Sequence, residues 1–119
     1  DVIFAAAGGS GLGVFNAAQQ GTFKAIGADV NQCLIDPDHI MLSAIRKIDV
    51  VIKDGIKSAI DGTLEGGTMV PGLKEDALGI TNEGSKVEID SASLDAAQTA
   101  KDKIISGEIT VPSTIDEVK

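Results

Sequence analysis

The feature that most constrains the fold of this chain is a glycine-rich loop between a short apolar run and a helix-like segment. Residues 1–7, DVIFAAA, are almost continuously apolar, which predicts a strand buried on both faces in a parallel sheet. Ser10 is a suitable cap for a helix that runs to Gln20 and ends at Gly21. Residues 23–29, FKAIGAD, predict the next strand, which completes a strand–helix–strand unit.

A long second helix is predicted from Asp36 to Gly62, with Asp36 as its cap and Pro37 in its first turn. His39 would then be a solvated residue at the start of this helix. The prediction rests on isoleucines at helical spacing, namely Ile45, Ile48, Ile52, Ile56 and Ile60.

The last third of the chain gives weaker signals. Residues 67–74 and 76–81 are candidate strands, and Pro71 would make the first of them an edge or distorted strand. A final helix is predicted to start at a cap, Ser91 or Ser93, and to end at Gly107. Its inward-facing residues are expected to be Leu94, Ala97, Ile104 and Ile105.

Composition excludes several classes of function. The 119 residues carry 18 acidic and 10 basic side chains, a net charge of −8, which argues against binding nucleic acids or anionic membranes. Cys33 and His39 are the only cysteine and histidine, so we expect no disulfide within the chain and no metal site. No apolar run approaches the roughly 18 residues of a membrane span. We also expect the chain to be a piece of a longer protein.

The glycine loop only partly fits a dinucleotide site. Gly9 and Gly11 match the first two glycines of the G-x-G-x-x-G pattern, and Asp29 follows about 20 residues later, where such sites carry a ribose-binding acid. However, the third glycine, Gly13, comes one position early, and no Lys-Ser/Thr pair follows as in a P-loop. Ser10 is not in a G-x-S-x-G motif and no Ser-His-Asp set is visible, so we expect no enzyme activity.

A binding site fits the same residues better. Parallel α/β sheets bind ligands beyond the carboxyl ends of their strands, and both the loop from Ala7 to Ser10 and Asp29 follow predicted strands. Glycines let backbone approach a ligand, and a carboxylate can accept hydrogen bonds from two vicinal hydroxyls, as on ribose. The alternative is that the glycines and Asp29 serve only tight turns.

At these residues the sequence resembles a known family. The stretches DVIFAAAGGSGLGVFNAAQQ, AIGADVNQ, DPDHIMLSAIRKIDVVIKDGIKSAIDG, GLKEDALGIT and AKDKIISGEITVPST occur in order. Together they closely resemble the last third of the basic membrane lipoprotein (Med/Bmp) family. Its members are purine-nucleoside-receptor-like substrate-binding lipoproteins of ABC transporters.

The resemblance implies an α/β fold, part of a type I periplasmic binding protein with two doubly wound parallel-sheet lobes and the ligand between them. Asp29 matches the acid that holds the ribose hydroxyls. Arg46 falls where the family often has a ligand-contacting Lys, and Arg and Lys are not interchangeable at a bonding site. The implied ligand-binding residues are Ala7, Gly8, Gly9, Ser10, Asp29 and Arg46.

The resemblance also implies a division of the chain. Residues 1–46 would belong to the C-terminal ligand-binding lobe, 47–75 to a crossover helix and strand packing on the N-terminal lobe, and 76–119 to a return through the hinge and a C-terminal helix. Crossings between lobes are expected near residues 46–50 and 72–80. The isoleucine helix would then expose an apolar stripe, so the isolated chain is expected to self-associate and to bind nucleosides poorly.

The implied function is the substrate-binding component of an ABC transporter that takes up a purine nucleoside. It implies an ABC permease as partner, no cofactor, and an extracytoplasmic, lipid-anchored location at the cell surface or in the periplasm. Two alternatives remain at this point: part of a Rossmann-type oxidoreductase that binds NAD(P) or another nucleotide, and a ligand-sensing domain without transport.

Overall fold

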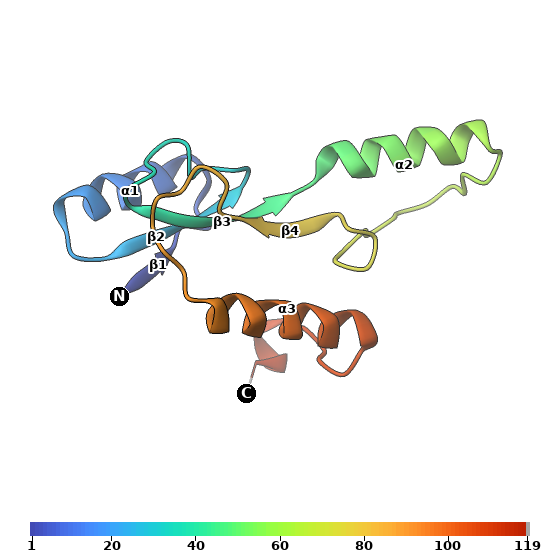
Figure 1. The fold of residues 1–119 in the computed structure, drawn as a ribbon. Helices are drawn as coiled ribbons and strands as arrows, with labels where there is room; N and C mark the ends of the chain where they lie inside the picture. The colour runs from blue at the N-terminus through green and yellow to red at the C-terminus, as the bar shows by residue number, and fades with distance from the viewer. Residues whose placement is uncertain (119) are drawn as a thin grey trace. The chain divides into compact units, whose positions relative to one another are not determined.

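The computed structural model describes residues 1–118 and divides the chain into two compact units, residues 1–88 and a second unit that begins at Ile89. The first unit is a mixed α/β structure (Figure 1). In chain order its elements are β1 (Val2–Phe4), η1 (Gly8–Ser10), α1 (Gly11–Gln20), β2 (Lys24–Asp29), β3 (Ile40–Arg46), α2 (Ile48–Ile60) and β4 (Leu78–Thr81). The second unit contains α3 (Ser91–Ser106) and η2 (Ile115–Glu117), where η denotes a short 3₁₀ helix.

The four strands form one sheet in the order β1-β2-β3-β4. The first three are parallel to one another, whereas β4 pairs with β3 in the antiparallel direction. The predicted α/β class and the opening strand–helix–strand unit are therefore confirmed. Because β2 and β3 are parallel neighbours, their last residues, Asp29 and Arg46, meet at the same edge of the sheet.

The core of the first unit lies where α1 packs on the sheet. Phe15 and Ala18 of α1 are buried together with Ala5, Ala25 and Ile40. The predicted burial of the first strand on both faces is wrong, because β1 is an edge strand whose three side chains are exposed and only the following Ala5 is buried in the core.

The long helix predicted from Asp36 to Gly62 is wrong in its first part. The Asp36 carbonyl accepts hydrogen bonds from the backbone N–H groups of His39 and Ile40, at 3.3 and 2.9 Å, and the turn ends there. The next seven residues form β3, in which Ile40 and Ser43 are fully buried. Pairing with β2 holds this segment in a strand, so the helical spacing of the isoleucines applies only from residue 48 onward.

Helix α2 does carry an apolar stripe, and the structure leaves it exposed. None of its residues is buried, and the exposed fractions of its isoleucines are 55% (Ile48), 56% (Ile52), 57% (Ile56) and 80% (Ile60). This matches the expected exposure, while the packing of this helix on another lobe stays a prediction. No helix within residues 1–118 is long and apolar enough to cross a membrane.

The two segments where crossings between lobes were expected lie side by side. The backbone N–H of Lys47 donates to the carbonyl of Ala77 at 2.8 Å, and Lys47 Nζ lies 2.7 Å from the carboxylate of Asp76. The candidate strand at 76–81 is confirmed as β4, which begins two residues later, whereas residues 67–74 form no strand. The assignment of residues 1–46, 47–75 and 76–119 to lobes stays a prediction.

The second unit confirms the final helix but changes its cap. The side chain of Asp90, rather than Ser91 or Ser93, accepts the capping hydrogen bond, from the backbone N–H of Ser93 at 2.8 Å. Gly107 ends the helix in the left-handed conformation, with φ of 80°, as its position predicted. Of the four residues expected to face inward, only Ile104 is half-buried, and Leu94, Ala97 and Ile105 are exposed.

The contrast between the buried β3 and the exposed α2 is testable in the 119-residue chain. Ile40→Ala should lower the free energy of unfolding by about 2–5 kcal/mol, because it leaves a cavity beside α1. Ile52→Ala removes the same atoms from an exposed site and should cost less than about 0.5 kcal/mol. Denaturant unfolding measures both, and equal losses would contradict the structure.

Candidate functional site

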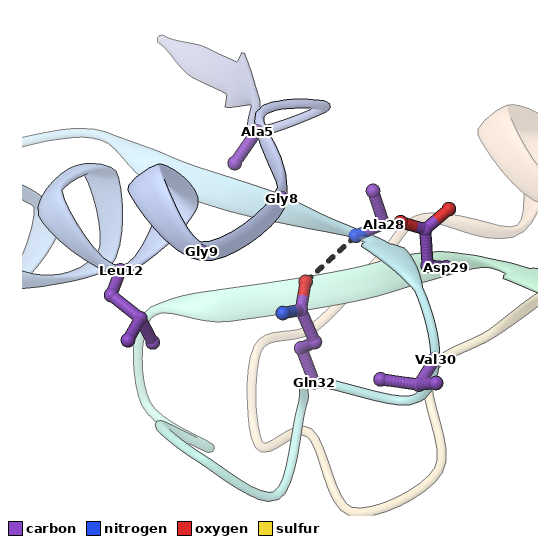
Figure 2. A pocket seen from close by; sticks show the side chains of 8 residues that line it. All are labelled: Ala5, Gly8, Gly9, Leu12, Ala28, Asp29, Val30 and Gln32. Atoms are coloured by element: carbon purple, nitrogen blue, oxygen red, sulfur yellow. Dashed lines mark hydrogen bonds between the residues drawn. The ribbon is translucent and has the colours of Figure 1, made fainter.

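An open pocket of about 270 Å³ lies beyond the carboxyl ends of β1 and β2 (Figure 2). This is the side of a parallel α/β sheet on which ligands usually bind. The walls are mostly apolar or bare backbone, and the only polar side chains among them are those of Asp29 and Gln32. The lining residues are Ala5, Gly8, Gly9, Leu12, Ala28, Asp29, Val30 and Gln32.

One wall is the glycine loop that leads into α1. Gly8 has φ of 54°, a left-handed conformation that glycine adopts without steric cost. A Cβ atom at Gly8 or Gly9 would have no neighbour within 4 Å, so the space beside this backbone is open. Among residues 1–118, no group accepts a hydrogen bond from the N–H of Gly8 or of Gly9. The loop therefore offers two backbone donors at the pocket wall.

The start of α1 was predicted at the right place but for the wrong reason. The helix begins after Ser10, yet the Ser10 side chain makes no capping hydrogen bond. The 3₁₀ turn η1 precedes the helix instead, and the Ser10 N–H donates to the carbonyl of Ala7 at 3.2 Å. Gly11 is buried, and a Cβ atom there would lie 3.3 Å from the Ala5 carbonyl, so this glycine allows close packing of the helix on the loop.

The opposite wall carries Asp29, the last residue of β2. Its φ is 73°, a left-handed conformation that Asp tolerates better than most residues and that turns the chain sharply after the strand. Its carboxylate Oδ1 forms an ion pair with Arg46 Nη2, at the end of β3. Both side chains are at least half exposed, at 50% and 59%, so the pair itself should add little to the stability of the fold.

Gln32 also lines the pocket, although the sequence did not identify it as a site residue. Its Oε1 accepts a hydrogen bond from the backbone N–H of Ala28 at 2.8 Å, and its own N–H donates to Ser43 Oγ at 3.0 Å. A Cβ atom at Gly27 would lie 2.8 Å from the Gln32 side chain and from Ser43 Oγ, so only glycine leaves room for it. The glutamine closes the GADVNQ turn, and that motif was the available sequence signal.

The predicted site residues fall into three groups. Gly8, Gly9 and Asp29 line the pocket; Ala7 and Ser10 lie in the same loop without lining it. Arg46 does not line the pocket either, but is joined to it through the ion pair with Asp29. Their binding roles remain predictions.

His39 and Cys33 have structural partners away from the lining of the pocket. His39 Nδ1 lies 3.0 Å from both carboxylate oxygens of Asp36, so His39 pairs with its turn rather than starting a helix. Cys33 is fully buried, with Sγ 3.6 Å from Ser43 Oγ and 3.8 Å from the Thr81 carbonyl. Within residues 1–118 there is no group of three or more His, Cys, Asp or Glu residues suited to a metal ion.

Comparison with known protein families shows to which of them the chain is related. Residues 1–115 match the model of the Bmp family, described as ABC transporter substrate-binding protein PnrA-like. The chain belongs to the Bmp family. This confirms the resemblance seen in the sequence, and members of this family are substrate-binding proteins of ABC transporters.

Similar proteins agree with this membership. The chain is 41% identical to Basic membrane protein D of Borreliella burgdorferi and 33% identical to the ABC transporter nucleoside-binding protein BmpA of Lactococcus lactis, over 94% and 95% of its length. It spans 34% and 36% of those relatives, about a third. A solved structure of ABC transporter solute-binding proteins from Aeropyrum pernix superposes with a TM-score of 0.71 at 26% identity, over 97% of this chain and 41% of that one.

The ion pair at the pocket edge yields a first prediction for this site. Arg46→Ala should change the free energy of unfolding by less than about 1 kcal/mol, because both partners are exposed to solvent. Denaturant unfolding at low salt measures the change. A loss of several kcal/mol would contradict this, because it would show that the stability of the fold depends on Arg46.

The turn before β3 should make stability fall in acid. Burial raises the pKa of Asp36, but hydrogen bonds from His39 and Gln19 and the charge of His39 outweigh it and lower that pKa below its ordinary 3.8. A carboxyl with a lowered pKa stabilises the fold above its unfolded-state pKa, and this contribution is lost as pH falls through the folded-state pKa. The free energy of unfolding should therefore decrease as the pH is lowered below about 4.

Asp36→Asn should flatten that acid fall, because the amide does not titrate. Asp54→Asn, on the exposed surface of α2, is the matched control and should leave the profile unchanged. Unfolding measured from pH 7 to pH 3 compares the two variants. Identical profiles for the wild type and Asp36→Asn would show that Asp36 does not couple folding to protonation.

Proposed function

We propose that this chain supplies one wall of the ligand cleft of an ABC transporter substrate-binding protein that takes up a purine nucleoside. The observation that supports it is the pocket at the carboxyl ends of β1 and β2, which is lined both by Asp29 and by a glycine loop with open backbone. Family membership and the relative named as nucleoside-binding agree with this ligand class.

Asp29 is the proposed ribose-binding group. Its carboxylate can only accept hydrogen bonds, and two vicinal hydroxyls are suitable donors. Because Arg46 occupies Oδ1, the second oxygen is the one more available to a ligand. Arg46 would orient the carboxylate and, when the ligand is bound, lie beside the same hydroxyls.

The glycine loop is the proposed contact for the remainder of the ligand on this wall. The free N–H groups of Gly8 and Gly9 can donate to ligand oxygen or nitrogen atoms, and neither residue has a side chain to keep the ligand away. Ala7 and Ser10 hold the turn through their backbone hydrogen bond.

The rest of the cleft would come from parts of the protein outside these residues. The pocket of 270 Å³ is slightly smaller than the roughly 300–1,000 Å³ of complete small-molecule sites. The chain also spans only about a third of its relatives. We further propose an ABC permease as partner and an extracytoplasmic, lipid-anchored location, in keeping with the family.

Asp29→Ala in the full-length protein should weaken nucleoside binding at least about tenfold, because losing one charge-assisted hydrogen bond costs about 1.4 kcal/mol or more. Titration calorimetry with inosine, guanosine, adenosine, free bases, sugars and NAD measures the affinity. Asp38→Ala is the matched control, since Asp38 is exposed and pairs with Lys86 outside the pocket.

The two parts of this proposal fail in different ways. Tight binding of NAD with none of the nucleosides would overturn the assignment of the ligand class. Nucleoside binding that is unchanged by Asp29→Ala would keep the ligand class but reduce Asp29 to a turn residue.

A further inference from the structure

The orientation of the Gln32 side-chain amide is fixed by chemistry. A backbone N–H can only donate a hydrogen bond, so the amide atom 2.8 Å from the Ala28 nitrogen must be the oxygen. The amide therefore cannot be flipped without leaving the Ala28 N–H facing another donor. Once Oε1 is fixed in this way, the position of Nε2 is fixed as well.

That nitrogen carries two donors that the protein does not use. Among residues 1–118, no group accepts a hydrogen bond from Nε2, and the atom is not sealed off from solvent. Gln32 lines the pocket, and Figure 2 shows Nε2 turned toward the side of the pocket on which Leu12 lies. A ligand in the pocket would therefore meet an amide NH₂ group already held in place.

The glutamine is held firmly enough to orient a ligand. Besides the Oε1 bond to Ala28, its backbone N–H is anchored on Ser43 Oγ, and Ser43 is fully buried in β3. The side chain also rests against Gly27, where a Cβ atom would come within 2.8 Å of it. Contacts to two neighbouring strands thus limit its freedom before any ligand arrives, which lowers the entropic cost of binding.

We infer that Gln32 is a specificity-determining residue of this pocket, whose Oε1 fixes the end of β2 while Nε2 donates a hydrogen bond to an uncharged acceptor on the ligand. The inference rests on the proposed nucleoside ligand and adds a requirement to it. Asp29 selects ligand groups that donate, whereas Gln32 selects a ligand group that accepts, such as a hydroxyl or ring oxygen, a carbonyl or a ring nitrogen.

Gln32→Glu separates the two functions of the side chain. A carboxylate oxygen can still accept from the Ala28 N–H, so the turn is kept, but the group that faces the pocket becomes an acceptor. In the full-length protein, calorimetry with inosine, adenosine and guanosine should show affinity at least about tenfold weaker, because an acceptor would oppose the ligand's acceptor.

The control for the added charge is Asn31→Asp. Asn31 is adjacent in sequence and does not line the pocket, and its Oδ1 accepts from the Cys33 N–H, a bond that Asp can keep. The substitution removes one exposed hydrogen bond, from Asn31 Nδ2 to the Glu83 carbonyl at 3.1 Å, which lies outside the pocket. This variant should bind nucleosides within about twofold of the wild type. Thermal unfolding of both variants checks that the fold is retained.

A second measurement does not depend on the variant folding. In ¹H–¹⁵N spectra of the wild type, the Gln32 side-chain NH₂ resonances should shift when inosine is added. Side-chain resonances that do not move, or equal affinities of Gln32→Glu and Asn31→Asp, would overturn the inference while leaving the nucleoside assignment intact. Failure of the wild type to bind any of the three nucleosides would overturn the proposed function, and this inference with it.

Discussion

The parallel pairing of β2 with β3 is the interaction on which the first unit depends. It buries Ile40 and Ser43 in the sheet and gives α1 a surface on which Phe15 packs. It also brings the ends of the two strands together, so that Asp29 and Arg46 can form an ion pair although they are far apart in sequence. The pocket is therefore a product of strand register as much as of the residues that line it.

The sequence predicted the elements whose signals are local. A glycine after a helix, a glycine loop after an apolar run, and the strand ending in Asp29 depend on neighbouring residues, and each was predicted within a residue or so. β3 was missed because Asp36, Pro37 and the isoleucine spacing also suit a helix. Only the partner strand β2, which the local pattern does not contain, decides between the two conformations.

In the candidate site, too, residues with a local sequence pattern were predicted, whereas a contribution that depends on three-dimensional contacts was not. Gly8, Gly9 and Asp29 were predicted because glycine loops and strand-end acids have recognisable patterns, and the structure places all three at one pocket. The GADVNQ motif marks the turn that Gln32 closes, but the contribution of Gln32 to the pocket depends on a hydrogen bond to Ala28 and on the missing side chain of Gly27, which the motif does not specify. These are three-dimensional relations within a short turn, and spacing alone does not specify them.

The burial of Cys33 gives the protein an internal reporter. It is the only thiol in the chain, and it lies fully buried between Ser43 of β3 and the carbonyl of Thr81 in β4. A thiol reagent can reach it only when this part of the sheet opens, so the rate of labelling measures local opening rather than surface reactivity. Ser43 also accepts the hydrogen bond from the Gln32 N–H, so the rate of Cys33 labelling would also depend on the stability of the turn that carries Gln32. No labelling site would have to be introduced for this measurement.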